Sequence, residues 1–161
     1  LSCFLLLLWA VFGLPAKAEF IALSIDNDIP AEIIDASHEG KRLVVMFQEA
    51  GCPWCNKMRE RVFGHPEVDE YFSRRFIIIE QDIKGDQGLI SHEGVEMTQK
   101  AFAKIMRVRG TPTFLFFDTD GKIAVRVPGY QDAITFLNTG RYVHEGVFKT
   151  GKSLVRWHME Q

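Results

Sequence analysis

The chain has 161 residues, of which 47% are hydrophobic, 12% aromatic and 25% charged. These proportions are typical of a globular protein and exclude a wholly disordered or collagen-like chain. Nineteen lysine and arginine residues against 21 acidic residues give a net charge of −2. Because the sequence has no basic excess and no run of basic residues, a nucleic-acid backbone and an anionic membrane surface are poor candidates for its ligand.

The first 18 residues have the pattern of an export signal. Residues 1–14 are uncharged and almost wholly apolar, and Ala16-Lys17-Ala18 follows with the small-x-small form of a signal-peptidase site. The apolar run is shorter than the roughly 18 residues that a membrane anchor needs. We therefore expect export, cleavage after Ala18 and a single domain over residues 19–161, with retention as an anchor as the alternative.

Helix and strand patterns alternate along the rest of the chain. Asp28 and Pro30 predict the start of a helix that ends at Gly40, and Lys84–Glu96 is predicted to be an irregular loop. Further helices are predicted from Cys52 to Gly64, from His65, over Ala101–Met106, over Asp132–Val143 and around Leu154 and Trp157. Strands are predicted at Leu43–Phe47, Phe76–Ile79, Thr113–Phe117 and Lys122–Val127. Intervening helices favour a parallel strand pair, and the Asp118–Gly121 turn favours a hairpin. The predicted fold class is α/β, with a mixed central sheet flanked by helices.

Cys52 and Cys55 are the two cysteines that remain after the expected cleavage, and a C-x-x-C pair fits either a zinc site or a redox couple. Zinc needs four ligands, and the five histidines are scattered singly (His38, His65, His92, His144, His158), so we predict no metal site and no cofactor. The pair lies between a buried strand and a helix. Cys52 would then lie at the helix N-terminus, where free N–H groups stabilise a thiolate, and Cys55 would be shielded one turn later. This asymmetry favours thiol–disulfide exchange, with Cys52 attacking and Cys55 resolving.

Two motifs make the chain resemble the thioredoxin superfamily from Ile29 to Val143. They are Cys52-Pro53-Trp54-Cys55 and Arg109-Gly-Thr111-Pro112-Thr113, the latter directly before a strand. The resemblance implies a three-layer thioredoxin-like fold and a cis bond before Pro112, with its loop facing the cysteines. It also implies that the Thr111 backbone pairs with an extended substrate segment, and it places Pro53 and Trp54 at the substrate groove.

A narrower resemblance is carried by Val45–Cys55, Arg109–Asp118 and Val127–Tyr130. These stretches are similar to the exported thioredoxin-like proteins of bacterial sulfur-oxidation (Sox) clusters. That likeness implies a periplasmic reductant that takes electrons from a membrane thiol donor. A monomer is expected because the sequence has no long coiled-coil pattern and no exposed apolar stripe. It would reduce a protein disulfide or the thiol of a sulfur-carrier protein. The alternatives are a disulfide-bond oxidant or isomerase and, in a different class, a non-catalytic metal or copper carrier that uses the two cysteines.

Several positions depart from the superfamily pattern. Met46 occupies the place of a buried aspartate six residues before the first cysteine, and Glu60 occupies that of a helix-bending proline, so a straighter helix is expected. Glu49 or a water could replace the missing aspartate as proton acceptor, although a solvated loop carboxylate is the simpler interpretation. The Lys84–Glu96 loop could border the cysteine groove, but an ordinary solvated loop is favoured, and Tyr130 is interpreted as packing.

Overall fold

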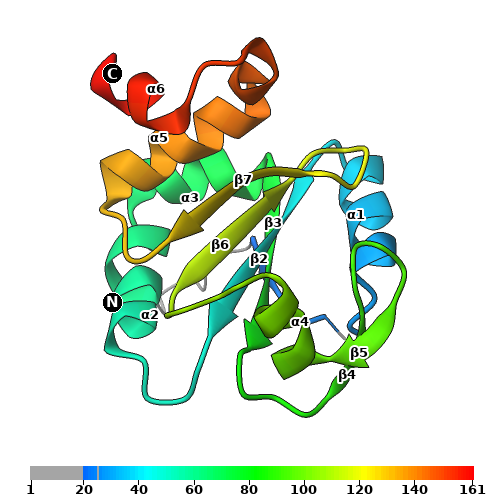
Figure 1. Cartoon of the computed structure of the whole chain (residues 1–161). Helices are drawn as coiled ribbons and strands as arrows, with labels where there is room; N and C mark the ends of the chain where they lie inside the picture. The colour runs from blue at the N-terminus through cyan, green and yellow to red at the C-terminus, as the bar shows by residue number, and fades with distance from the viewer. Residues whose placement is uncertain (1–19, 25) are drawn as a thin grey trace, which may run out of the picture.

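A mixed β-sheet runs through the middle of the computed structural model, which describes residues 20–24 and 26–161 (Figure 1). The predicted export signal and its cleavage site lie outside these residues. The five strands have the order β1-β3-β2-β6-β7. Their bounds are β1 Ile21–Ala22, β2 Arg42–Gln48, β3 Phe76–Asp82, β6 Thr113–Phe117 and β7 Ile123–Pro128. Strands β1, β3 and β2 are parallel, β6 is antiparallel to β2, and β7 is antiparallel to β6.

Helices cover both faces of this sheet (Figure 1). One face carries α1 (Ile29–His38) and α4 (Gln99–Ile105). The other carries α2 (Pro53–Lys57), its π-helical continuation η1 (Met58–Phe63), α3 (Pro66–Ser73) and α5 (Ala133–His144). None of the helices within residues 20–24 and 26–161 combines the length and apolar character needed to cross a bilayer.

The alternation of side chains along β2 explains why its sequence is a continuous apolar run. Val44 and Met46 belong to the core under α3 and α5, whereas Leu43, Val45 and Phe47 belong to the core under α1 and α4. A strand that is buried on both faces needs apolar residues at every position. The α/β class, the parallel β2–β3 pair and the β6–β7 hairpin are therefore confirmed.

Two local predictions were wrong. The helix after Cys52 does not continue as a regular α-helix, because Met58–Phe63 adopt π-helical hydrogen bonding. The Lys84–Glu96 stretch is not an irregular loop. It holds β4 (Gly88–Ile90), which pairs with β5 (Glu96–Thr98) in a separate two-stranded sheet. A three-residue strand is too short to show a clear alternation of apolar and polar residues.

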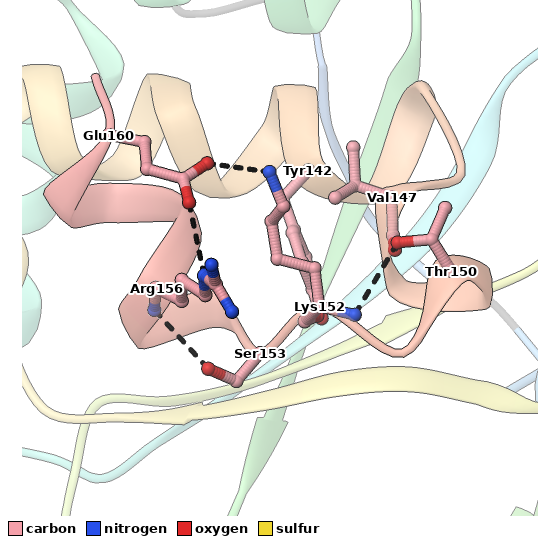
Figure 2. Close-up of polar contacts among 7 residues, drawn as sticks. All are labelled: Tyr142, Val147, Thr150, Lys152, Ser153, Arg156 and Glu160. Atoms are coloured by element: carbon pink, nitrogen blue, oxygen red, sulfur yellow. Dashed lines mark hydrogen bonds and ion pairs between the residues drawn. The ribbon is translucent and has the colours of Figure 1, made fainter.

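The C-terminal residues extend the helical layer over α5. The 3₁₀-helix η2 (Val147–Thr150) leads into α6 (Leu154–Met159), as the weak pattern around Leu154 predicts. Figure 2 shows Glu160 accepting hydrogen bonds from Lys152 Nζ at 2.5 Å and Arg156 Nε at 3.2 Å. The Tyr142 hydroxyl of α5 donates to the Lys152 carbonyl at 2.7 Å. The Tyr142 contact attaches the tail to α5, away from α2 in Figure 1, and the Glu160 contacts hold the tail together.

Candidate redox active site

The two cysteines lie at the junction between β2 and α2. Gly51 reverses the chain with φ +77°, a conformation that favours glycine, and Cys52 then caps the helix. The backbone N–H of Cys55 donates to Cys52 Sγ at 3.1 Å, and the two sulfurs form a disulfide with the Cα atoms 5.3 Å apart. Cys52 keeps 7% of its surface exposed, whereas Cys55 is fully buried. This is the asymmetry expected of an attacking and a resolving cysteine.

The loop before β6 forms the second part of the site. The Thr111–Pro112 bond is cis, as predicted. Thr111 lines one shallow depression with Cys52, Pro53 and Trp54, while Pro112 is buried. Within the described part of the chain, the main-chain N–H and carbonyl of Thr111 have no hydrogen-bond partner. They are therefore free to pair with an incoming extended segment.

An aromatic pair forms one side of this depression. Trp54 is 51% exposed, and its ring centroid lies 5.5 Å from that of Tyr130 in the loop after β7. Lys57 of α2 places its ammonium 4.7 Å from the Trp54 centroid and 4.9 Å from the Tyr130 centroid. A cation over an aromatic face is attracted by the electrons of the ring, so Lys57 holds the two rings together. Tyr130 does pack, as interpreted from the sequence, but it packs against a residue of the C-x-x-C motif.

Glu49 also lines the depression, close to the loop that carries Thr111. Its carboxylate accepts from Lys84 Nζ at 2.5 Å and from the Thr111 hydroxyl at 3.3 Å. The hydrogen bond from Lys84 holds the pKa of Glu49 below its usual value, which opposes the effect of partial burial. Lys84 begins the Lys84–Glu96 stretch that could border the cysteine groove, and its ion pair with Glu49 brings this one residue to the edge of the depression.

No carboxylate replaces the missing aspartate within β2 itself. Met46 is fully buried in the same apolar cluster as both cysteines. Glu80 is its neighbour in register on β3, but Arg59 engages both oxygens of that carboxylate at 2.8 and 2.9 Å. Both oxygens of this carboxylate are therefore occupied by the guanidinium. The immediate surroundings of the buried cysteine are therefore apolar.

Four of the six predicted site residues line the depression, and the other two are buried beside it. The lining residues are Cys52, Pro53, Trp54 and Thr111, and the buried ones are Cys55 and Pro112. Within residues 20–24 and 26–161, no three His, Cys, Asp or Glu side chains gather in a metal-binding arrangement. Sequence reasoning missed Lys57 and considered Lys84 only as the start of a loop, because a single lysine carries no signal until the fold pairs it with a partner.

Comparison with known proteins agrees with this geometry. A family model described as a thioredoxin-like domain matches residues 29–144. Thiol:disulfide interchange protein DsbD of Salmonella typhi is 29% identical over 126 residues, covering 76% of this chain and 20% of the relative. The chain thus spans about one fifth of the length of this curated relative.

Solved structures show the same fold. A thioredoxin-fold protein from Helicobacter pylori superposes with a TM-score of 0.69 at 20% identity, covering 89% of this chain and 88% of that one. The oxidised C-terminal domain of Neisseria meningitidis DsbD gives a TM-score of 0.52 at 23% identity, over 69% and 89% of the two chains. The matched regions support the expected enzyme class, a thiol–disulfide oxidoreductase. The chain belongs to the family of thioredoxin-like domains.

Proposed function

We propose that this chain is a periplasmic thiol–disulfide oxidoreductase that reduces disulfide bonds in other proteins through Cys52 and Cys55. The observation that carries the proposal is the Cys52–Cys55 disulfide, whose first sulfur belongs to a slightly exposed residue and whose second is fully buried. A partner can then reach only Cys52. Cys55 remains available to release that partner.

The reaction consists of two exchanges of sulfur–sulfur bonds. In the reduced chain the Cys52 thiolate attacks one sulfur of the partner's disulfide. That bond breaks, one partner thiolate leaves, and a mixed disulfide forms. Cys55 then loses its proton and attacks Cys52 Sγ, which releases the second partner thiolate and forms the Cys52–Cys55 disulfide. Two electrons pass to the partner, whose two sulfurs take up protons from solvent. A thiol donor returns the pair to its reduced form.

Four further residues hold the partner in this proposal. Pro53 and Trp54 supply an exposed surface beside Cys52, and the unpaired backbone of Thr111 pairs with an extended segment of the partner. Pro112 shapes the loop that presents Thr111. Main-chain pairing of this kind tolerates many sequences, so specificity must come from side chains around the groove.

The proposed location, electron donor and substrate are supported by the sequence and by its relatives. The apolar first 14 residues and Ala16-Lys17-Ala18 support export with cleavage after Ala18, which leaves a monomeric domain over residues 19–161. The likeness to proteins named thiol:disulfide interchange proteins supports electron exchange with a redox partner. The membrane thiol donor is proposed from the resemblance to the sulfur-oxidation proteins. The similarity to thioredoxin-like proteins of sulfur-oxidation clusters makes a sulfur-carrier protein the proposed substrate.

Trapping of the mixed disulfide tests the activity. The Cys55→Ser variant should accumulate a covalent complex with a disulfide-containing protein such as insulin, because its resolving thiol is missing. The Cys52→Ser variant should form none. Complex formation by both variants, or by neither, would contradict the assigned roles.

The direction of electron flow is tested by the reduction potential of the Cys52–Cys55 couple in glutathione and dithiothreitol buffers. A value of about −270 mV or lower is expected of a reductant. A value between about −180 and −120 mV would make the chain an oxidant or isomerase instead.

A further inference from the structure

A second depression adjoins the redox centre on the side of the loop that precedes Pro112. Thr111 lines both this depression and the one around Cys52, so the two lie next to each other. The other lining residues are Arg107, Arg109, Gly110, Thr113, Arg126, Pro128 and Gly129. Three arginines and no carboxylate therefore line a surface that a partner bound at Thr111 would pass.

The positive charge of this surface arises from the fold. Arg107 and Arg109 follow α4, whereas Arg126 comes from β7, and pairing of β6 with β7 brings the two segments together. All three side chains are exposed, and none forms an ion pair with another described residue. Because the whole chain carries a net charge of −2, this concentration of positive charge is local.

The arginines are arranged by the surrounding backbone. Arg107 adopts φ +51° at the end of α4, where its N–H donates to the Lys104 carbonyl at 2.9 Å. Glycine satisfies such a turn at lower conformational cost, so the turn itself does not require an arginine. The guanidinium of Arg126 donates to the Met106 carbonyl, which uses one of its five N–H donors and leaves the others free.

Exposed arginines without an ion-pair partner favour carboxylates as ligands. The planar guanidinium matches the two oxygens of a carboxylate, and unpaired arginines attract acidic groups over several ångströms. We propose that Arg107, Arg109 and Arg126 form a carboxylate-binding subsite that favours protein disulfides flanked by acidic residues. The subsite rests on the proposed function, since it acts on a partner whose disulfide reacts with Cys52.

Matched peptides test the subsite. Two disulfide-linked peptides of identical sequence, one with glutamates and the other with glutamines beside the cysteine, are offered to the reduced chain. The readout is the ratio of the two kcat/KM values at about 20 mM and about 500 mM NaCl, since salt screens exposed charges. At low salt the acidic peptide should react about fivefold faster, as expected of exposed ion pairs, and at high salt the ratio should approach one.

Two double variants assign the effect to these residues. Arg107→Gln with Arg109→Gln should reduce the low-salt ratio to near one. Arg74→Gln with Arg156→Gln removes the same charge from the end of α3 and from α6, and should preserve the ratio. A ratio measured within one protein is independent of the fraction of active material, so a partly unfolded variant still gives a valid result.

The outcomes separate this proposal from the proposed function. Equal reduction of both peptides by the unmodified chain at low salt would overturn the subsite and leave the redox activity intact. An unchanged preference in the Arg107/Arg109 double variant would also overturn it. If that variant lost activity only toward oxidised glutathione, the arginines would serve a small carboxylate ligand and the peptide subsite would be wrong. If neither peptide were reduced, the redox proposal itself would fail, and the subsite with it.

Discussion

The two ends of the central sheet use charged residues in opposite ways. At the end where β2 leads into Cys52, charged side chains lie at the surface, as in the Glu49–Lys84 pair and the three unpaired arginines. At the other end, where β2 begins, Asp118 is only 5% exposed and accepts from Lys149 Nζ at 2.6 Å and Arg42 Nε at 3.4 Å. At the first end the three arginines remain available to partners, whereas at the other end the buried carboxylate is satisfied within the chain.

The internally paired end extends to α5. Arg42 Nη1 lies 2.8 Å from His144 Nδ1, at the last residue of that helix. Because Asp118 follows β6, Arg42 begins β2 and Lys149 lies in η2, one carboxylate joins two strands to the C-terminal segment. A buried carboxylate of this kind is stable only while its partners remain in place. We infer that this end holds the fold together and that the other end carries the chemistry.

The largest expected effect is a loss of activity at the redox end without a loss of stability. Cys52→Ser should reduce the rate of insulin reduction by dithiothreitol to that of dithiothreitol alone, because the attacking sulfur is gone. The urea midpoint of the variant should match that of the reduced unmodified chain, since serine closely replaces cysteine at a slightly exposed position. A variant that retained catalysis would show that Cys52 is not the nucleophile.

Asp118→Asn should have the converse effect, a loss of stability with little change in activity. The amide keeps the shape but loses the charge that faces Arg42 and Lys149, so the free energy of unfolding should fall by about 2 kcal/mol. Urea denaturation gives this value, and insulin reduction at 25 °C should change by less than about twofold in the folded variant. A large loss of activity without loss of stability would contradict the division between the two ends.

The redox site and the Arg42–Asp118 pair differ in how far the sequence predicts them. Cys52 and Cys55 stand in a short motif whose chemistry indicates their role, and the resemblance to the thioredoxin superfamily indicates that of Pro112. Arg42 and Asp118 are 76 positions apart, and nothing in either neighbourhood marks them as partners. The same holds for Lys57 with Tyr130 and for Glu49 with Lys84. Apolar periodicity predicts the layers of the fold, whereas pairing of charges depends on strand register, which periodicity does not specify.

The packing of α5 on α3 offers a smaller test, of stability alone. Gly140 lies inside α5, where glycine is normally unfavourable, but an added Cβ would lie 2.8 Å from the ring of Phe72. That ring is buried and stacks on Phe136 with the centroids 4.6 Å apart, so it has little room to move. Gly140→Ala should therefore lower the free energy of unfolding by about 1.5 kcal/mol despite the better helix propensity of alanine.

Gly88→Ala is the matched control, because its added Cβ would meet nothing within 4 Å and its φ is not positive. Its urea midpoint should stay close to that of the unmodified chain. A stabilised Gly140→Ala variant would show that the packing of α3 on α5 relaxes easily.

Acid should weaken the internally paired end. Burial, together with the positive charges of Arg42 and Arg75, holds the pKa of His144 below its usual value. The unfolded chain therefore binds a proton at His144 that the folded chain does not, and stability falls as the pH drops below about 6.5. The urea midpoint should decrease between pH 7.5 and 5.5, and His144→Gln should lessen that decrease. An identical decrease in the variant would place the effect on other groups.

The smallest expected effect concerns Glu49 at the redox end. The Lys84 hydrogen bond keeps the pKa of this carboxylate low, so Glu49 is ionised and weakly basic at neutral pH. It is therefore a poor acceptor for the Cys55 proton, and Glu49→Gln should leave the pH dependence of insulin reduction unchanged. Since glutamine still accepts from the Thr111 hydroxyl, the rate at pH 7 should change by less than about twofold. A shift of the pH profile would instead make Glu49 the replacement for the aspartate that Met46 displaces, and the surface charge at this end would then take part in proton transfer.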